Sequence, residues 1–243
     1  MRLKFSLLFV IGFGLYSMNA QSQSNRFGMK SGIAISDFTQ QETTLGDNTI
    51  QWKGSVSYQT GFFYNKRVVE SALSIQTEFD YKELRTAFDL REVDNRITTA
   101  TDVIYSIRNV GWSVLPRIDL FSGKTLNPNF MIGPQVDFSL SSDVLIKSNT
   151  TGSDPLLGDA RFGGSTSKYN EKVKFGYVMA GGIEIKTKPV IVTIEGRYSS
   201  LFTKTFNSEV EELPLNNDTY LLKLVENMRE QYYSVLIGFN FYF

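Results

Sequence analysis

The last twelve residues constrain the fold of this chain more than any other stretch. Apolar and aromatic side chains occupy every second position there: Tyr233, Val235, Ile237, Phe239, Phe241 and Phe243. Small or polar residues, among them Ser234, Gly238 and Asn240, lie between them. Successive side chains of a β-strand point to opposite faces, so this spacing predicts a strand with one apolar and one mixed face.

Seven earlier segments show the same two-residue period, and we expect each to be a strand. They lie at about 26–37, 55–64, 71–84, 103–118, 130–140, 171–186 and 190–198. In the fourth, Tyr105 and Ile107 are out of phase with Val110 and Trp112, which predicts a β-bulge near Asn109, because one extra residue reverses the alternation. Pro134 is unfavourable within a central fifth strand, since it has no N–H to donate.

The connections between these strands alternate in length. Residues 38–54, 85–101, 141–170 and 200–231 are long and mostly polar or charged, and we expect loops there. The segments 65–70, 122–128 and 187–189 are short and predict tight turns. Transmembrane β-barrels have this asymmetry, because their periplasmic turns are tight and their extracellular loops are extended.

The first twenty residues have the pattern of a secretory signal. Arg2 and Lys4 precede a mostly apolar run from Phe5 to Met18, and Ala20 supplies a small residue for cleavage. We therefore expect a signal peptide at 1–20 and a single barrel domain at 21–243. A short membrane anchor is the alternative interpretation of the same run.

Together these features predict an all-β fold, an eight-stranded antiparallel outer-membrane β-barrel with meander topology. A soluble lipocalin-like barrel also has eight strands. The alternating connections, the targeting segment and the aromatic final residue jointly favour the membrane barrel. An even number of strands then places both termini in the periplasm and the four long loops outside the cell.

Composition excludes several chemistries. The 243 residues contain no cysteine and no histidine, which rules out disulfides, thiol catalysis, Ser-His-Asp hydrolysis and histidine-bound metals. Barrel enzymes such as outer-membrane phospholipases, lipid A deacylases and omptin-type proteases depend on a catalytic histidine. Equal numbers of basic and acidic residues, 25 each, also disfavour nucleic-acid binding. We expect a protein that is not an enzyme and has no cofactor.

Charged residues recur on the faces expected to point into the barrel. They are Lys30, Glu78, Asp80, Arg117, Asp119, Asp137, Lys174, Glu184, Glu195 and Arg197. Strand direction places Lys30, Arg117, Asp119 and Glu184 in the periplasmic half and the other six in the extracellular half. Buried charges must be paired, so we expect a structural ion-pair network. A gated ion path or a small polar ligand site is the alternative.

The last long connection contains a candidate docking segment. Leu221, Leu224, Val225 and Met228 recur at helical spacing, and this amphipathic stretch could contact a partner. Local packing of the connection on itself, or an extension of the closing strand, would explain the same pattern.

Three segments resemble the PorT-type outer-membrane β-barrel family of the Bacteroidetes: 27–36, 111–116 and 238–243. The final strand also resembles the assembly signal of bacterial outer-membrane barrels, which ends in Phe. The first resemblance implies a small barrel whose namesake is implicated in export through the type IX secretion system. The second implies recognition by the barrel assembly machinery.

From these resemblances we expect a component embedded in outer-membrane lipid that docks secretion-system or other envelope proteins through its loops. A structural or adhesin-like surface barrel and a narrow channel for small solutes are the alternatives.

Overall fold

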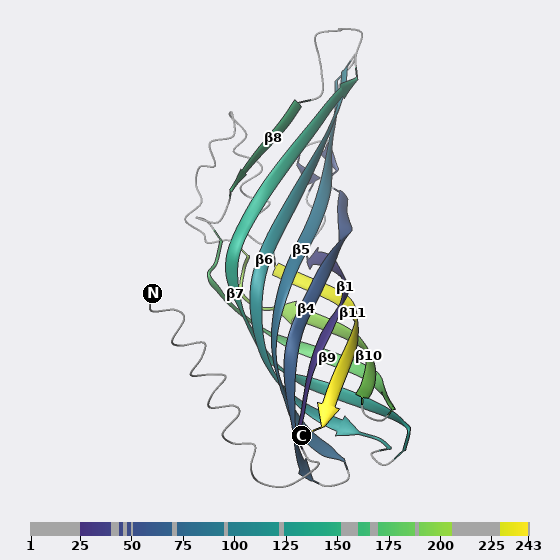
Figure 1. The fold of residues 1–243 in the computed structure, drawn as a ribbon. Coiled ribbons are helices and arrows are strands. Elements are labelled where there is room, and N and C mark those ends of the chain that lie inside the picture. Colours follow the sequence, from purple (N-terminus) through teal and green to yellow (C-terminus); the bar gives the residue numbers. More distant parts are fainter. Residues whose placement is uncertain are drawn as a thin grey trace, which may run out of the picture.

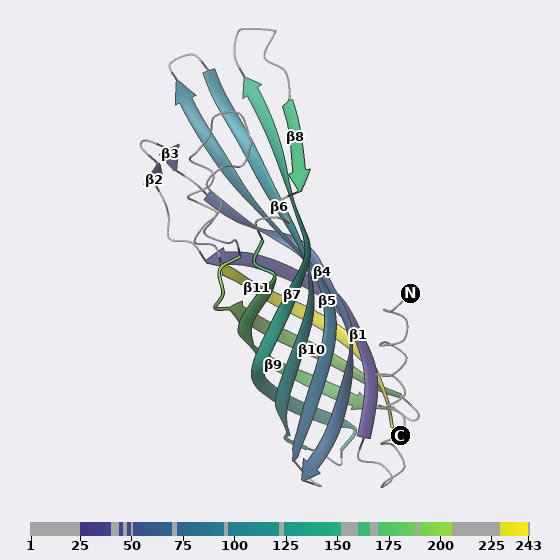
Figure 2. The ribbon, with the colours of Figure 1, turned by 90° about the vertical axis from the view of Figure 1, so that its left-hand side faces the viewer.

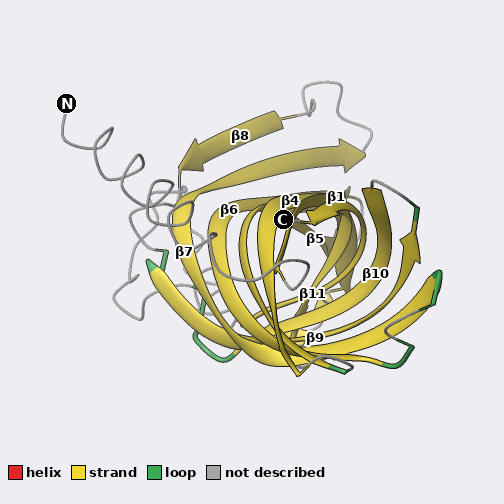
Figure 3. Ribbon diagram, turned by 60° about the horizontal axis from the view of Figure 1, so that its bottom comes forward, coloured by secondary structure: helices red, strands yellow, loops and turns green. Residues whose placement is uncertain are grey.

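Antiparallel pairing joins eight strands of the computed structural model into a closed ring (Figure 3). The model describes residues 25–39, 44–45, 48–49, 51–69, 72–94, 97–121, 124–151, 160–165, 170–187, 190–205 and 229–242. Its strands are β1 (Asn25–Thr39), β2 (Thr44–Leu45), β3 (Asn48–Thr49), β4 (Gln51–Val69), β5 (Leu73–Asp94), β6 (Ile97–Asp119), β7 (Leu126–Thr151), β8 (Ala160–Ser165), β9 (Val173–Lys186), β10 (Val190–Leu201) and β11 (Arg229–Tyr242). Among the described residues we find no helix that could act as a membrane span.

The ring follows the chain as a meander. Its order is β1, β4, β5, β6, β7, β9, β10 and β11, and β11 pairs with β1 to close it. The predicted eight-stranded antiparallel barrel is therefore confirmed. The short strand β8 lies outside the ring and pairs only with β7 among the described strands (Figure 3).

The first and last described strands begin and end at one end of the barrel, which we call the terminal end (Figure 1). Arg26 is paired there with Tyr242. The connections from β4 to β5, β6 to β7 and β9 to β10 also lie at this end, and all three are short. The opposite end, where β5, β6 and β7 continue beyond the other strands, is the extended end.

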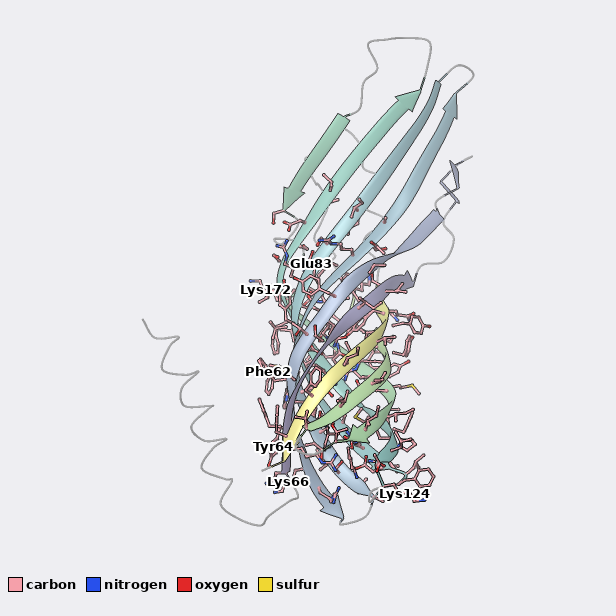
Figure 4. All side chains as sticks on the ribbon, turned by 45° about the vertical axis from the view of Figure 1, so that its right-hand side comes forward. Phe62, Tyr64, Lys66, Glu83, Lys124 and Lys172 are labelled. Carbon is pink, nitrogen blue, oxygen red and sulfur yellow. The ribbon has the colours of Figure 1, made fainter. Side chains whose placement is uncertain are left out.

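Alternation along each strand separates an apolar wall from a polar interior. On β11, Tyr233, Val235, Ile237 and Phe239 point outward and are about half exposed, whereas Leu236 and the small or polar residues between them are buried. The apolar wall continues on the other strands of the ring, where Phe79, Ile132 and Ile194 are about half exposed, and Figure 4 shows Phe62 on the outer wall. An apolar exterior of this kind fits a lipid surrounding.

Aromatic side chains contact one another near both ends of this wall. Phe27 stacks on Phe62 with 6.0 Å between the ring centroids, toward the terminal end. Toward the extended end, Tyr198 lies between Tyr177 and Tyr233, with centroid distances of 6.0 and 5.0 Å. Such rows are typical of the two interfaces of a membrane, where an aromatic body meets a polar surface.

Three neighbouring strands and β8 project from the extended end (Figures 1 and 2). We call residues 85–94, 97–104, 141–151 and 160–165 the extension. Here β5 and β6 stay paired up to Asp94 and Ile97, and β6 and β7 up to Thr98 and Thr151. Strand β7 has 26 residues and β10 has 12, so β7 is the longer of the two by roughly 45 Å.

The extension corrects the loops expected at 85–101 and 141–170, which are largely strand. A hairpin that projects beyond the lipid has no apolar surroundings to face, so its sequence needs no apolar alternation. Smaller corrections concern 38–54, which contains β2, β3 and the start of β4, and 65–70, where β4 continues to Val69.

The bulge lies on a different strand from the one expected. Strand β6 pairs with β5 without interruption, but its pairing with β7 jumps from Arg108↔Ser141 to Asn109↔Ser139. The extra residue is therefore Leu140 of β7. The apparent parity change in β6 has another cause, since Tyr105 and Ile107 are apolar residues buried inside the barrel.

Pro134 is accommodated in β7 without a change of register. The paired positions between β6 and β7 stop at Ser113↔Gln135 and resume at Arg117↔Met131, in the same register. Pro116 of β6 lies in the same gap. Two residues without an N–H group thus share one local interruption of the hydrogen-bonded ladder.

Candidate functional site

The structure places all ten predicted inward charges inside the barrel, where none is more than 6% exposed. It brings them together with three further buried charges that our sequence analysis missed: Arg26, Lys82 and Glu230. Lys82 lies two residues after Asp80 and four after Glu78, on the same face of the strand, so the two-residue alternation alone could have identified it as an inward charge. Glu230 lies before the expected start of the closing strand, which is why it was overlooked.

The layer nearest the terminal end contains two arginines and two carboxylates. Arg26 donates to Glu184 at 2.8 Å, and Arg117 lies 2.5 Å from the same carboxylate and 2.7 Å from Asp119. Asn127 also donates to Asp119, at 3.0 Å. Every formal charge of this layer is balanced by its neighbours.

The middle layer is a closed square of four charges from three strands. Lys30 of β1 lies 2.5 Å from Glu78 of β5 and 3.2 Å from Glu195 of β10. Arg197 of β10 donates to both carboxylates at 2.6 Å. Lys30 was expected in the periplasmic half, apart from these partners, and it instead joins them.

Gln76 links these two layers. Its amide nitrogen donates to Glu78 at 2.6 Å, and its amide oxygen accepts from Arg117 at 3.3 Å. A cavity of about 10 Å³ lies beside it, lined by Lys30, Arg117 and Glu195 among others. A cavity of that size holds about one water molecule.

A third layer surrounds the ammonium group of Lys82. Its Nζ lies 2.7 Å from Asp137, 2.8 Å from the hydroxyl of Tyr232 and 3.3 Å from Asp80. Gln59 donates to Asp80 at 2.7 Å, and Gln135 donates to Asp137 at 2.7 Å.

A separate ion pair, Lys174 with Glu230, lies next to this layer, and Asn109 donates to Glu230 at 2.9 Å. Apolar side chains then close the interior toward the extended end. Leu84, Tyr105 and Ile107 are fully buried there, although sequence analysis placed no apolar set inside the barrel.

The base of the extension has a polar cluster on its outer face, just beyond the tyrosine pair Tyr58–Tyr81. Glu83 accepts from Arg85 at 2.6 Å and lies 3.7 Å from Arg108. Burial raises the pKa of Glu83, but hydrogen bonds from Arg85 and Tyr58 outweigh it and hold this pKa below its ordinary value. Figure 4 shows Glu83 above the lipid-facing wall.

The structure describes only some of the residues predicted for the assembly signal and for the docking segment. Five residues of the expected assembly signal, from Tyr233 to Phe241, face outward on β11, and Phe243 lies outside the described residues. The candidate docking residues Leu221, Leu224, Val225 and Met228 also lie outside the described residues, as does the expected signal peptide at 1–20.

The described residues contain no group of three or more carboxylates arranged to hold a metal ion. The interior instead contains layers of paired charges, closed by apolar residues toward the extended end. Outside the interior, the most distinctive feature of the structure is the extension.

Residues 19–207, more than half of the chain, match the model of the family described as outer membrane protein beta-barrel domain. The chain belongs to this family. It is therefore an outer-membrane β-barrel, and the exposed apolar wall is its lipid-facing surface. No curated protein matches the chain in sequence.

Several solved structures are similar to this outer-membrane barrel in fold. Neisserial surface protein A is 13% identical, with 92% of this chain and 100% of that chain covered and a TM-score of 0.43. OprG from Pseudomonas aeruginosa is 11% identical, with 91% and 97% covered and a TM-score of 0.43. Ail, the attachment invasion locus protein of Yersinia pestis, solved with the heparin analogue sucrose octasulfate, is 9% identical, with 90% and 99% covered and a TM-score of 0.36. These likenesses concern the fold alone.

Proposed function

We propose that this outer-membrane barrel is a non-enzymatic component that docks another envelope protein through its extension. The observation that carries the proposal is the one-sided projection of β5, β6, β7 and β8 beyond the barrel. A barrel needs strands only as long as the lipid is thick. The further residues of these strands serve neither the lipid contact nor the closure of the ring, and the sheet that they form is a suitable platform for a partner.

The orientation that we propose places the terminal end in the periplasm and the extension outside the cell. Tight connections lie at the terminal end, as in barrels inserted from the periplasm. In this account residues 1–20 direct export and are removed, leaving 21–243. The outward row of β11 then presents the assembly signal to the barrel assembly machinery.

The filled interior favours docking over transport. Eight strands enclose a space that side chains can fill. Here Lys30, Arg197 and their carboxylate partners cross the middle of the barrel, and Leu84, Tyr105 and Ile107 close it above. A solute path would require several buried ion pairs to separate, at a cost of several kcal/mol each.

The partner that we propose belongs to a secretion system, in keeping with the resemblance to PorT-type barrels. Export of a defined set of proteins then depends on the extension. A structural or adhesin-like role would use the same platform to contact another surface and would leave export unchanged.

The test is a strain in which the β5–β6 hairpin is shortened above the pair Thr86↔Tyr105 and closed with a tight turn. The barrel below this pair is unaltered, so its level in the outer membrane is the internal control. We expect selective loss of exported proteins from the surface and the medium, as in a full deletion. A normal export profile with a normal barrel level would contradict the secretion role.

A further inference from the structure

The charge layer around Lys82 differs from the other layers of the barrel interior. The terminal and middle layers each pair two cations with two carboxylates, and Lys174 is paired with Glu230. In its own layer Lys82 is a single cation beside two carboxylates, Asp80 and Asp137, although Arg197 of the middle layer lies 3.7 Å from Asp80. With both ionised, this layer has one excess negative charge, in a part of the barrel where both carboxylates are at least nine-tenths buried. An uncompensated charge in such a place is costly.

The same layer is short of hydrogen-bond donors. Oδ1 of Asp80 lies 3.3 Å from the ammonium group of Lys82 but accepts no hydrogen bond, and the amide oxygens of Gln59 and Gln135 accept none either. Both amides use their nitrogen to donate to a carboxylate, so exchanging oxygen and nitrogen would place two acceptors against each other. All three atoms that lack a hydrogen bond are thus acceptors, and the layer could take up one more donor with a positive charge.

Because Gly111 of β6 has no side chain, the charged groups of this layer can approach one another closely beside it. A Cβ atom built on Gly111 would be 2.2 Å from Oδ1 of Asp80, 2.7 Å from Oδ1 of Asp137 and 2.7 Å from Nζ of Lys82. The two carboxylate oxygens therefore converge on one point that holds no side chain. A metal cation at this point would touch the ammonium group of Lys82, whereas a proton on a carboxylate oxygen would not.

We propose that Asp80 and Asp137 share one bound proton at the point beside Gly111 where their oxygens converge. The proton converts one carboxylate into a donor and makes the layer neutral. The groups that face it are Lys82 of β5, Gln59 of β4, Gln135 of β7, Tyr232 of β11 and Arg197 of β10, whose guanidinium lies 3.7 Å from Asp80. The site is a proton-binding site within the closed barrel.

The proposal predicts an unusual result for an isosteric substitution. Asp80→Asn supplies a neutral donor permanently and leaves Lys82 with Asp137, so the unfolding midpoint of the purified barrel in detergent should be unchanged or higher at neutral pH. The matched control is Asp119→Asn, because Asp119 belongs to a balanced layer with Arg117, Arg26 and Glu184. Its midpoint should fall by several degrees. Equal losses in both variants would overturn the proposal.

The pH dependence provides a second readout. A proton bound more tightly in the folded than in the unfolded state stabilises at low pH, and this stabilisation is lost as the pH rises and the pair releases it. The parent barrel should therefore lose stability as the pH rises above about 4, where the carboxyl groups of the unfolded chain ionise, and Asp80→Asn should show a smaller loss. A parallel decline in both proteins would contradict the proposal.

Infrared spectroscopy tests the unmodified protein directly, even if a variant fails to fold. The parent barrel at neutral pH should show the carbonyl stretch of a protonated carboxyl group, shifted in heavy water and missing in Asp80→Asn. Absence of such a band from the parent would overturn the shared proton.

Discussion

The guanidinium of Arg197 donates to Glu78 at 2.6 Å across the barrel, although the two residues are 119 positions apart in the sequence. Their strands, β10 and β5, are not neighbours in the ring, so the contact crosses the interior. Lys30 and Glu195 complete the same square of charges. The interior thus links strands that the hydrogen-bonded wall does not join directly.

Removal of one member of this square should be costly. Arg197→Met would leave Glu78 and Glu195 with only Lys30 between them, and breaking a buried pair costs about 3–5 kcal/mol. Arg85→Met is the control, because its side chain is 52% exposed at the outer cluster and should contribute less than about 1 kcal/mol. Urea unfolding of the barrel in lipid vesicles measures both. Similar losses in the two variants would contradict the structural role of the square.

Closure of the ring depends on a close approach at Gly32. A Cβ atom on this residue would lie 1.9 Å from the carbonyl oxygen of Val235 on β11, so β1 and β11 could not pair as they do. We expect Gly32→Ala to lower the folded fraction, at a cost of about 1–3 kcal/mol or more. Gly181→Ala is the control, since its nearest neighbour atom would be 3.9 Å away. Heat-modifiable migration on gels reports the folded fraction, and equal folding of both variants would sink this explanation.

Arginine substitutions at different depths in the membrane test whether the apolar wall faces lipid. Ile237 is 51% exposed on the wall and lies midway along β11, so Ile237→Arg should destabilise the barrel in vesicles by about 2–4 kcal/mol. Leu120 is 61% exposed at the terminal end, and Leu120→Arg should cost about 0–1 kcal/mol because it reaches the interface. The assay is equilibrium unfolding in the same vesicles. An equal cost at the two positions would argue against this position of the membrane.

The filled interior predicts the absence of steady conductance in planar bilayers at neutral pH. The combined variant Lys30→Ala, Glu78→Ala and Arg197→Ala removes three members of the middle layer and should conduct more than the parent. A parent barrel that conducts as well as this variant would favour the channel function that we consider less well supported.

Sequence periodicity predicts the barrel well where lipid and interior impose opposite demands on alternate residues. The strand count, the meander and the inward positions of residues such as Glu78 and Arg197 follow from this period. The periodicity fails to predict strands where one face no longer contacts lipid. Residues 85–101 have no apolar face because the extension leaves the lipid, and their charged composition resembled a loop.

The ion pairs that cross the interior also could not be predicted from the sequence. Parity shows that Lys30 and Glu195 point inward, but their meeting depends on strand tilt and stagger, which one sequence does not show. The bulge shows the same limit, since Leu140 shifts β7 while the altered pattern was noticed in β6.

The most direct test of the account is photo-crosslinking in living cells from single positions on the barrel. Probes at the base of the extension, at Arg85 and Arg108, are compared with a probe at Lys124, which Figure 4 shows at the opposite end of the molecule. The account predicts a discrete protein adduct from the extension that is absent from Lys124. Adducts from Lys124 alone, with none from the extension, would contradict docking through the extension.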